Sequence, residues 1–256
     1  MSTGALKTRV PRPAQADDRP QVDLDTAKYL LFGLDSVEGW GVDGQLARLF
    51  LHLDGFHKQR RLFGNLFEIG VHHGRTAVLL ALMSEAGEVS VFVDLFERQA
   101  ENVDFSGKGD RQIFEANLAK WAPGREARVL QGNSMELDFA STPELADGVR
   151  FAHIDGAHYP AAVLNDIAKT RSVLLDGGIV VVDDFMHTGF PGVNEACNAY
   201  LAAASPDRLD PVAIGRNKLI LTTPDAREAL FAHVALFEAR PTAVFHGQEV
   251  LCLDPH

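Results

Sequence analysis

The chain has 256 residues, of which 46% are hydrophobic and 23% are charged, and these values are ordinary for a globular protein. It contains 24 Lys and Arg against 35 Asp and Glu, so its formal net charge is −11. This balance argues against nucleic acid and against anionic membrane surfaces as partners, because both are bound mainly through Lys and Arg.

Cysteine usage and the lack of long apolar runs indicate where the protein works. The two cysteines, Cys197 and Cys252, form no disulfide framework, which suits a reducing, cytoplasmic location. No run of about 18 apolar residues is present, so we expect no membrane span. The N-terminal residues before Asp17 contain no apolar signal core, so we expect no secretion. Soluble oligomeric proteins are mostly homo-oligomers, and we expect a homo-oligomer here.

The N-terminal quarter differs in pattern from the rest of the chain. Residues 1–22 are rich in proline and charge, and we expect a flexible tail. Residues 23–64 are expected to form a helical cap or lid, with apolar positions at helical spacing after a candidate N-cap, Asp43. The glycine-rich segment 37–42 is interpreted either as a lid over a site or as a loop anchored by a buried Trp40.

Residues 65–256 alternate short apolar runs with helical stretches, a pattern typical of an α/β protein with a doubly wound, mostly parallel sheet. We expect seven strands, at 66–69, 89–94, 127–130, 149–154, 179–182, 212–214 and 219–221. The last two flank a short turn, so one strand near the C-terminal edge is expected to be antiparallel. The final apolar run, 244–253, is either a further strand or an oligomer contact.

A glycine loop follows the first predicted strand. Its pattern is Glu68-x-Gly70-x-x-x-Gly74, which differs from the Gly-x-Gly-x-x-Gly of a dinucleotide-binding fold. A carboxylate before the loop suits an ammonium group and repels a pyrophosphate. Asp94 ends the second predicted strand, where an acid can hold a ribose diol. Together these features favour a cationic, ribose-bearing cofactor over NAD, and S-adenosylmethionine fits that description.

At these motifs the chain resembles the class I methyltransferases. The loop and Thr76 look like their first motif, Asp94 looks like their second-strand acid, and Gly132-Asn133-Ser134 is similar to the segment that lines the adenine. The resemblance implies a Rossmann-like methyltransferase fold that binds S-adenosylmethionine. The implied cofactor-binding residues are Glu68, Gly70, Gly74, Thr76, Asp94, Asn133, Ser134 and Asp155.

Three carboxylates follow two later strands. Asp155 ends one predicted strand, and Asp183 and Asp184 end the next. Neighbouring parallel strands bring such residues to one sheet edge, where three carboxylates would repel one another without a cation. Oxygen ligands suit Mg²⁺ first, with Ca²⁺ or Mn²⁺ as alternatives. Strand-end Asp residues also cap turns without any metal. His158 is a candidate general base beside this cluster, and His187 is a second one.

The same region resembles, more narrowly, the macrocin-type O-methyltransferases, which are metal-dependent and methylate sugar hydroxyls of natural products. The resemblance runs from about Phe67 to Tyr200 and rests on four segments. These are Asp155-Gly156-Ala157-His158-Tyr159, Leu174-Leu175-Asp176-Gly177-Gly178, Asp183-Asp184 and Pro191-Gly192-Val193. It implies that Asp155, Asp183 and Asp184 bind the metal and that His158 is the general base. Some members carry an acidic base where this chain has Ala157, so here the role falls to His158.

The sequence therefore predicts an O-methyltransferase that moves a methyl group from S-adenosylmethionine to a hydroxyl of a small-molecule acceptor. The expected acceptor is a sugar on a glycosylated natural product, with a divalent metal orienting its diol. Two alternatives stay open. One is a nicotinamide-dependent oxidoreductase on a related fold, and the other is a non-catalytic relative that binds S-adenosylmethionine.

Overall fold

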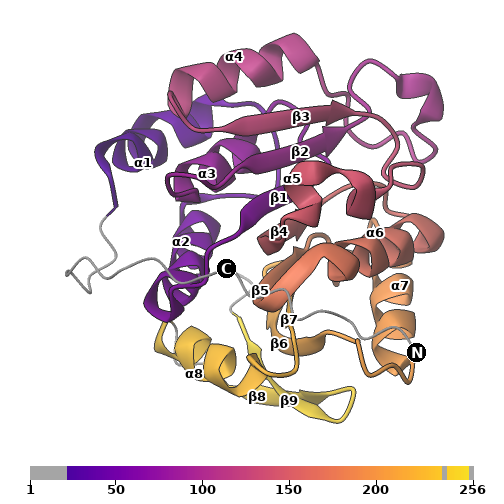
Figure 1. Ribbon diagram of the computed structural model, residues 1–256. Coiled ribbons are helices and arrows are strands. Elements are labelled where there is room, and N and C mark those ends of the chain that lie inside the picture. The colour runs from indigo at the N-terminus through magenta and orange to yellow at the C-terminus, as the bar shows by residue number, and fades with distance from the viewer. Residues whose placement is uncertain (1–21, 238–240, 254–256) are drawn as a thin grey trace.

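One nine-stranded sheet organises the protein, and a computed structural model describes it for residues 22–237 and 241–253. The predicted tail, 1–22, lies outside the described residues except for Val22. The strands are β1 (Asn65–Ile69), β2 (Ser90–Asp94), β3 (Ala127–Gln131), β4 (Val149–Ile154), β5 (Leu174–Val182), β6 (Asp210–Gly215), β7 (Lys218–Thr222), β8 (Thr242–Phe245) and β9 (Gln248–Cys252). Their spatial order is β3-β2-β1-β4-β5-β7-β6-β9-β8 (Figure 1).

The strand directions confirm the doubly wound, mostly parallel sheet. Strands β1 to β5 are parallel, and β7 runs antiparallel between β5 and β6. The predicted total of seven strands with one antiparallel is wrong at the C-terminal edge. There β9 pairs in parallel with β6, and β8 pairs antiparallel with β9. The final apolar run thus extends the sheet, because the exposed backbone groups of edge strand β6 pair with β9.

Helices cover both faces of the sheet (Figure 1). They are α1 (Leu24–Lys28), α2 (Gly44–Arg60), α3 (Arg75–Met83), α4 (Arg111–Trp121), α5 (Pro143–Ala146), α6 (Pro160–Val173), α7 (Pro191–Ala202) and α8 (Arg227–Phe237). Alternate strand residues feed two cores: Phe92 and Phe151 pack with α2 and α3, whereas Val91 and Ala152 pack with α6 and α7. None of the helices in the described part of the chain is long and apolar enough to span a membrane.

Helix α2 belongs to the first of these cores. The carboxylate of Asp43 accepts hydrogen bonds from the backbone of Gln45 and Leu46, which confirms Asp43 as the N-cap. Trp40, just before it, is 70% exposed, so the idea of a loop anchored by a buried Trp40 is wrong. The side chain of Arg75 instead holds this segment by donating to the carbonyl oxygens of Gly39 and Val42. The division into tail, cap and catalytic domain stays a prediction.

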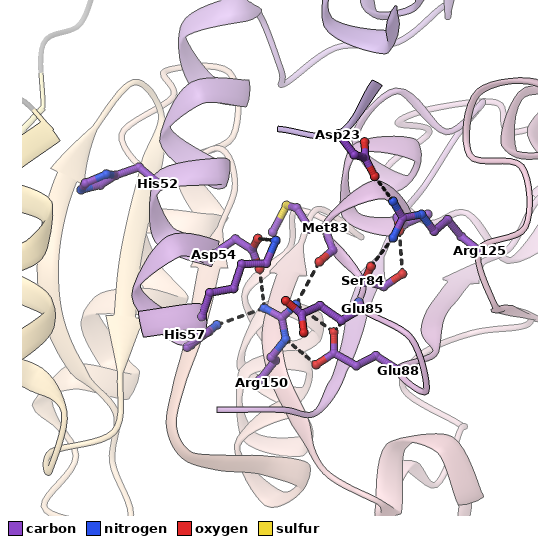
Figure 2. Close-up of polar contacts among 12 residues, drawn as sticks. Asp23, His52, Asp54, His57, Met83, Ser84, Glu85, Glu88, Arg125 and Arg150 are labelled. Carbon is purple, nitrogen blue, oxygen red and sulfur yellow. Dashed lines mark hydrogen bonds and ion pairs between the residues drawn. The ribbon is translucent and has the colours of Figure 1, made fainter. Parts of the chain in front are cut away.

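A buried arginine ties α2 to the start of β4. Arg150 is 1% exposed, and its guanidinium donates to both carboxylate oxygens of Glu88 and to Asp54, at 2.6–3.0 Å (Figure 2). Nδ1 of His57 lies 3.3 Å from Nη1 of the same guanidinium. A buried guanidinium needs this degree of pairing to offset the loss of its hydration. The cluster anchors the end of the sheet at which β4 begins, away from the strand ends that carry the predicted site.

Candidate active site

A cavity of about 750 Å³ opens at the carboxyl ends of the parallel strands. The sheet order diverges between β1 and β4, and ligands of doubly wound sheets bind beside such a switch point. Ten of the eleven predicted site residues line this cavity, and the exception is Gly74. The lining ten are Glu68, Gly70, Thr76, Asp94, Asn133, Ser134, Asp155, His158, Asp183 and Asp184.

The glycine loop between β1 and α3 needs both of its glycines. Gly70 has φ +81°, and a Cβ there would collide with the carbonyl oxygen of Asp155. Gly74 has φ +94° and is the N-cap of α3, where a Cβ would lie 3.0 Å from the ring of Phe114. Gly70 therefore lets β1 and β4 approach beneath the cavity, while Gly74 shapes the loop and lets α4 pack against it.

Glu68 offers a free carboxylate oxygen at the base of the cavity. Its side chain is 1% exposed, and Oε1 lies 2.8 Å from Nδ1 of His153 on the neighbouring strand. Oε2 is buried without a hydrogen-bond partner. Burial raises the pKa of Glu68, and the hydrogen bond with His153 opposes that rise. An unpartnered buried acceptor that lines a cavity fits the ammonium group of the predicted cofactor.

Asp94 organises the loop that it faces. Its Oδ2 accepts the backbone N–H groups of Val71 and His72, at 2.7 and 2.9 Å. Its Oδ1 accepts the N–H of Phe96 at 2.6 Å. A carboxylate oxygen has two lone pairs, so Oδ1 keeps capacity for one further donor. In this structure Asp94 accepts hydrogen bonds from the backbone of the loop. A ribose hydroxyl would have to bind at Oδ1, which has the remaining lone pair.

The loop after β3 is held by a lysine. Nζ of Lys169 donates to the carbonyl oxygens of Ser134, Met135 and Leu137, at 2.7–2.9 Å. The side chain of Asn133 accepts the N–H of Met135 at 3.0 Å. These bonds fix the predicted adenine-lining segment before any ligand binds, which lowers the entropic cost of binding.

The three strand-end carboxylates lie in two overlapping groups. Asp155 and Asp183 form one with His153, and Asp155 and Asp184 form the other with His158. Within each group the potential ligand atoms lie within 4.8 Å of one another. Burial, and next the charge of Asp183, raises the pKa of Asp155 well above its usual range.

The oxygen atoms of these carboxylates suit the coordination of a divalent cation. Among the described residues, no hydrogen-bond donor contacts the carboxylate of Asp155, and Oδ2 of Asp183 has no hydrogen-bond partner. Carboxylate oxygens are the ligands that Mg²⁺ and Mn²⁺ prefer.

His158 lies between two carboxylates. Its Nδ1 is 3.0 Å from Oδ2 of Asp104, and its Nε2 is 2.9 Å from Oδ2 of Asp184. The ring of Phe190 stacks on the imidazole at 3.9 Å. Burial lowers the pKa of His158, but the hydrogen bonds with Asp104 and Asp184 outweigh it and raise the pKa to about 9. With both carboxylates in contact, His158 is therefore a cation at neutral pH.

Three residues of the site were not predicted from the sequence. Asp104 comes from an irregular loop and carried no signal of its own. His153 lies within the buried strand β4, and Lys218 is the first residue of the buried strand β7. A polar residue in a strand that is buried on both faces needs a partner, and this signal was available in the sequence.

Comparisons with known proteins agree with this fold. Residues 67–185 match a family described as a methyltransferase domain. The match and the fold agree: residues 67–185 are similar to a methyltransferase domain, and the sheet that contains them has the Rossmann-like methyltransferase fold. No curated protein matches the chain in sequence.

Solved structures resemble it over most of its length. The O-methyltransferase NovP has a TM-score of 0.59 at 15% identity, covering 71% of this chain and 81% of its own. The cofactor-bound Rv0187 from MTB has a TM-score of 0.55 at 18% identity, covering 78% and 89%. An O-methyltransferase from Bacillus cereus in complex with SAH has a TM-score of 0.52 at 15% identity, covering 76% and 88%. At these identities the likeness is one of fold.

Proposed function

We propose that this protein transfers the methyl group of S-adenosylmethionine to a hydroxyl oxygen of a small-molecule acceptor, a sugar of a glycosylated natural product. The observation that carries the proposal is the meeting, in one cavity, of an unpartnered Glu68 oxygen and a histidine–carboxylate cluster. The likeness in fold to the O-methyltransferase NovP supports oxygen as the methylated atom.

The cofactor half of the cavity is formed by the ends of β1, β2 and β3. In the proposal, Oε2 of Glu68 accepts from the cofactor's ammonium, and Oδ1 of Asp94 accepts from its ribose. Asn133 and Ser134 line the adenine. S-adenosylmethionine supplies an electrophilic methyl group that needs an oxygen nucleophile in line with the methyl–sulfur bond, so positioning accounts for much of the rate.

The acceptor half is formed by the ends of β4 and β5. Asp155, Asp183 and Asp184 are proposed to hold a divalent cation, Mg²⁺ first, which when bound would lower the pKa of an acceptor hydroxyl. Once Asp184 serves as a ligand, its oxygen is no longer available to His158. Asp104 keeps the proton on Nδ1, so Nε2 is left to accept the hydroxyl proton.

Two measurements test this proposal. Calorimetry with S-adenosylhomocysteine and with NAD should show binding of the first only, and the reverse result would favour a nicotinamide-dependent oxidoreductase. Transfer of a labelled methyl group to vicinal diols, such as methyl glycosides and catechol, should require a divalent cation and stop with EDTA. Binding without transfer to any diol would indicate a non-catalytic relative.

The expectation that the protein forms a homo-oligomer stays a prediction.

A further inference from the structure

A buried lysine lies inside the proposed cation site. The side chain of Lys218 is 2% exposed, and its Nζ lies 2.5 Å from Oδ1 of Asp183. The register of the sheet explains the contact, because β5 and β7 pair Val182 with Leu219. The next antiparallel pair outward is therefore Asp183 and Lys218. A buried ammonium is tolerated only when it is paired, and Asp183 is its ion-pair partner.

Asp183 faces the imidazole of His153 on its other side. Its Oδ2 lies 3.2 Å from Nε2 of His153, an ion-pair contact without hydrogen-bond geometry. On the far side of the imidazole, Nδ1 of His153 lies 2.8 Å from Oε1 of Glu68. Acidic and basic side chains thus alternate across the sheet, in the order Glu68, His153, Asp183, Lys218.

Asp155 and Asp184 have different surroundings from Asp183. Asp184 lies 2.9 Å from Nε2 of His158, whereas the ammonium group of Lys218 contacts Asp183. Asp183 is thus the carboxylate of the three that forms a buried ion pair with a lysine. A divalent cation that binds at Asp183 must therefore share that carboxylate with the ammonium group of Lys218.

We infer that Lys218 is a resident cation of this site, which neutralises Asp183 and thereby weakens the binding of a divalent cation to the three carboxylates. This inference rests on the proposed function, because it assigns a regulating residue to the same cation site. Asp155 and Asp184 then provide most of the attraction for the divalent ion. A weakly held ion exchanges with solvent, so we expect dialysis to remove it from the purified protein.

The test is a Mn²⁺ titration of the full-length protein, with free Mn²⁺ followed by electron paramagnetic resonance. The Lys218→Met variant removes the charge and keeps most of the side chain, and we expect it to bind Mn²⁺ about tenfold more tightly than the wild type. Lys218→Arg keeps the charge and is the matched control, with the affinity of the wild type. An unchanged or weaker affinity in Lys218→Met overturns the inference.

A second variant covers the case in which Lys218→Met fails to fold. The double variant Asp183→Asn/Lys218→Met replaces the ion pair by a neutral pair of similar size, a change that proteins commonly tolerate. Because the pair is already neutral overall, its Mn²⁺ affinity should lie within about threefold of the wild type. A loss of about tenfold or more would mean that Lys218 does not offset the contribution of Asp183 to Mn²⁺ binding, and would overturn the inference.

The outcomes separate this inference from the proposed function. If the wild type binds Mn²⁺ and Lys218→Met binds it equally well, only the role of Lys218 is wrong. If neither the wild type nor any variant binds Mn²⁺ at millimolar concentration, the cation of the proposed function is wrong, and the inference falls with it. Calorimetry with S-adenosylhomocysteine on each variant confirms that the cofactor half of the cavity is intact.

Discussion

Oδ2 of Asp104 accepts two hydrogen bonds from His158, one from the backbone N–H at 2.6 Å and one from Nδ1 at 3.0 Å. Burial raises the pKa of Asp104, but its bonds with His158 and Ser106 outweigh it and hold the pKa well below the usual range. Asp104 is therefore a permanent anion that fixes both the orientation of the imidazole and the nitrogen that keeps its proton.

The first prediction concerns the general base. His158→Gln should lower methyl-transfer turnover by about 10²–10⁴-fold, because proton removal from the acceptor loses its base. Asp104→Asn keeps the imidazole but weakens the hold on its tautomer, so we expect a smaller loss in kcat with little change in the KM for S-adenosylmethionine. Steady-state kinetics with the labelled cofactor measure both, and calorimetry with S-adenosylhomocysteine checks the fold. Loss of turnover in His187→Gln instead would move the role to His187.

The second prediction concerns pH and stability in EDTA. The folded-state pKa of His158, about 9, lies above its ordinary value of 6.5, so folding favours the protonated ring. The stabilisation from His158 is then fully present below about pH 6.5 and is lost as the pH rises through about 9. Urea unfolding across this range should show the wild type converging on His158→Gln with increasing pH. A constant difference between the two proteins would contradict the proposed charge state.

The third prediction tests the glycine loop. In Gly70→Ala the new Cβ would collide with the carbonyl oxygen of Asp155, so β1 and β4 must separate and binding of S-adenosylhomocysteine should be lost. Gly87→Ala is the matched control, because Gly87 has a similar φ of +86° with nothing within 4 Å of the Cβ. It should cost only about 1–2 kcal/mol of backbone strain and leave ligand binding unchanged. If calorimetry shows the same loss of S-adenosylhomocysteine binding in both variants, the loss comes from backbone strain and not from the collision with Asp155.

The fourth prediction concerns the buried arginine. Arg150→Met leaves the carboxylates of Asp54 and Glu88 without their guanidinium, and we expect a loss of about 3–5 kcal/mol in the free energy of unfolding. Arg111→Met breaks an exposed ion pair with Glu115 and should change it by less than about 0.5 kcal/mol. Urea denaturation compares the two variants. A small effect at Arg150 would indicate that water enters and solvates the cluster.

Periodicity and strand-end chemistry predicted most of the sheet, and ten of the eleven site residues predicted from them line the cavity. Parallel α/β units place the residue after each strand at a common edge, so the spacing of Asp94, Asp155 and Asp183 along the chain was enough to assign them to one cavity. The C-terminal edge was not predicted in the same way. The pairing of β9 with β6 depends on a long-range contact that local pattern does not specify.

What the sequence by itself determined was the fold class, the glycine loop and the carboxylates at the strand ends, because each depends on residue type and on spacing along one β-α unit. Only the tertiary structure decided which charges meet. Lys218 reaches Asp183 through the register of β7 on β5, and His153 joins Glu68 to Asp183 across three neighbouring strands. Asp104 reaches His158 from a loop 54 residues earlier. These contacts are non-local, so their energies depend on burial and distance, which exist only once the chain has folded.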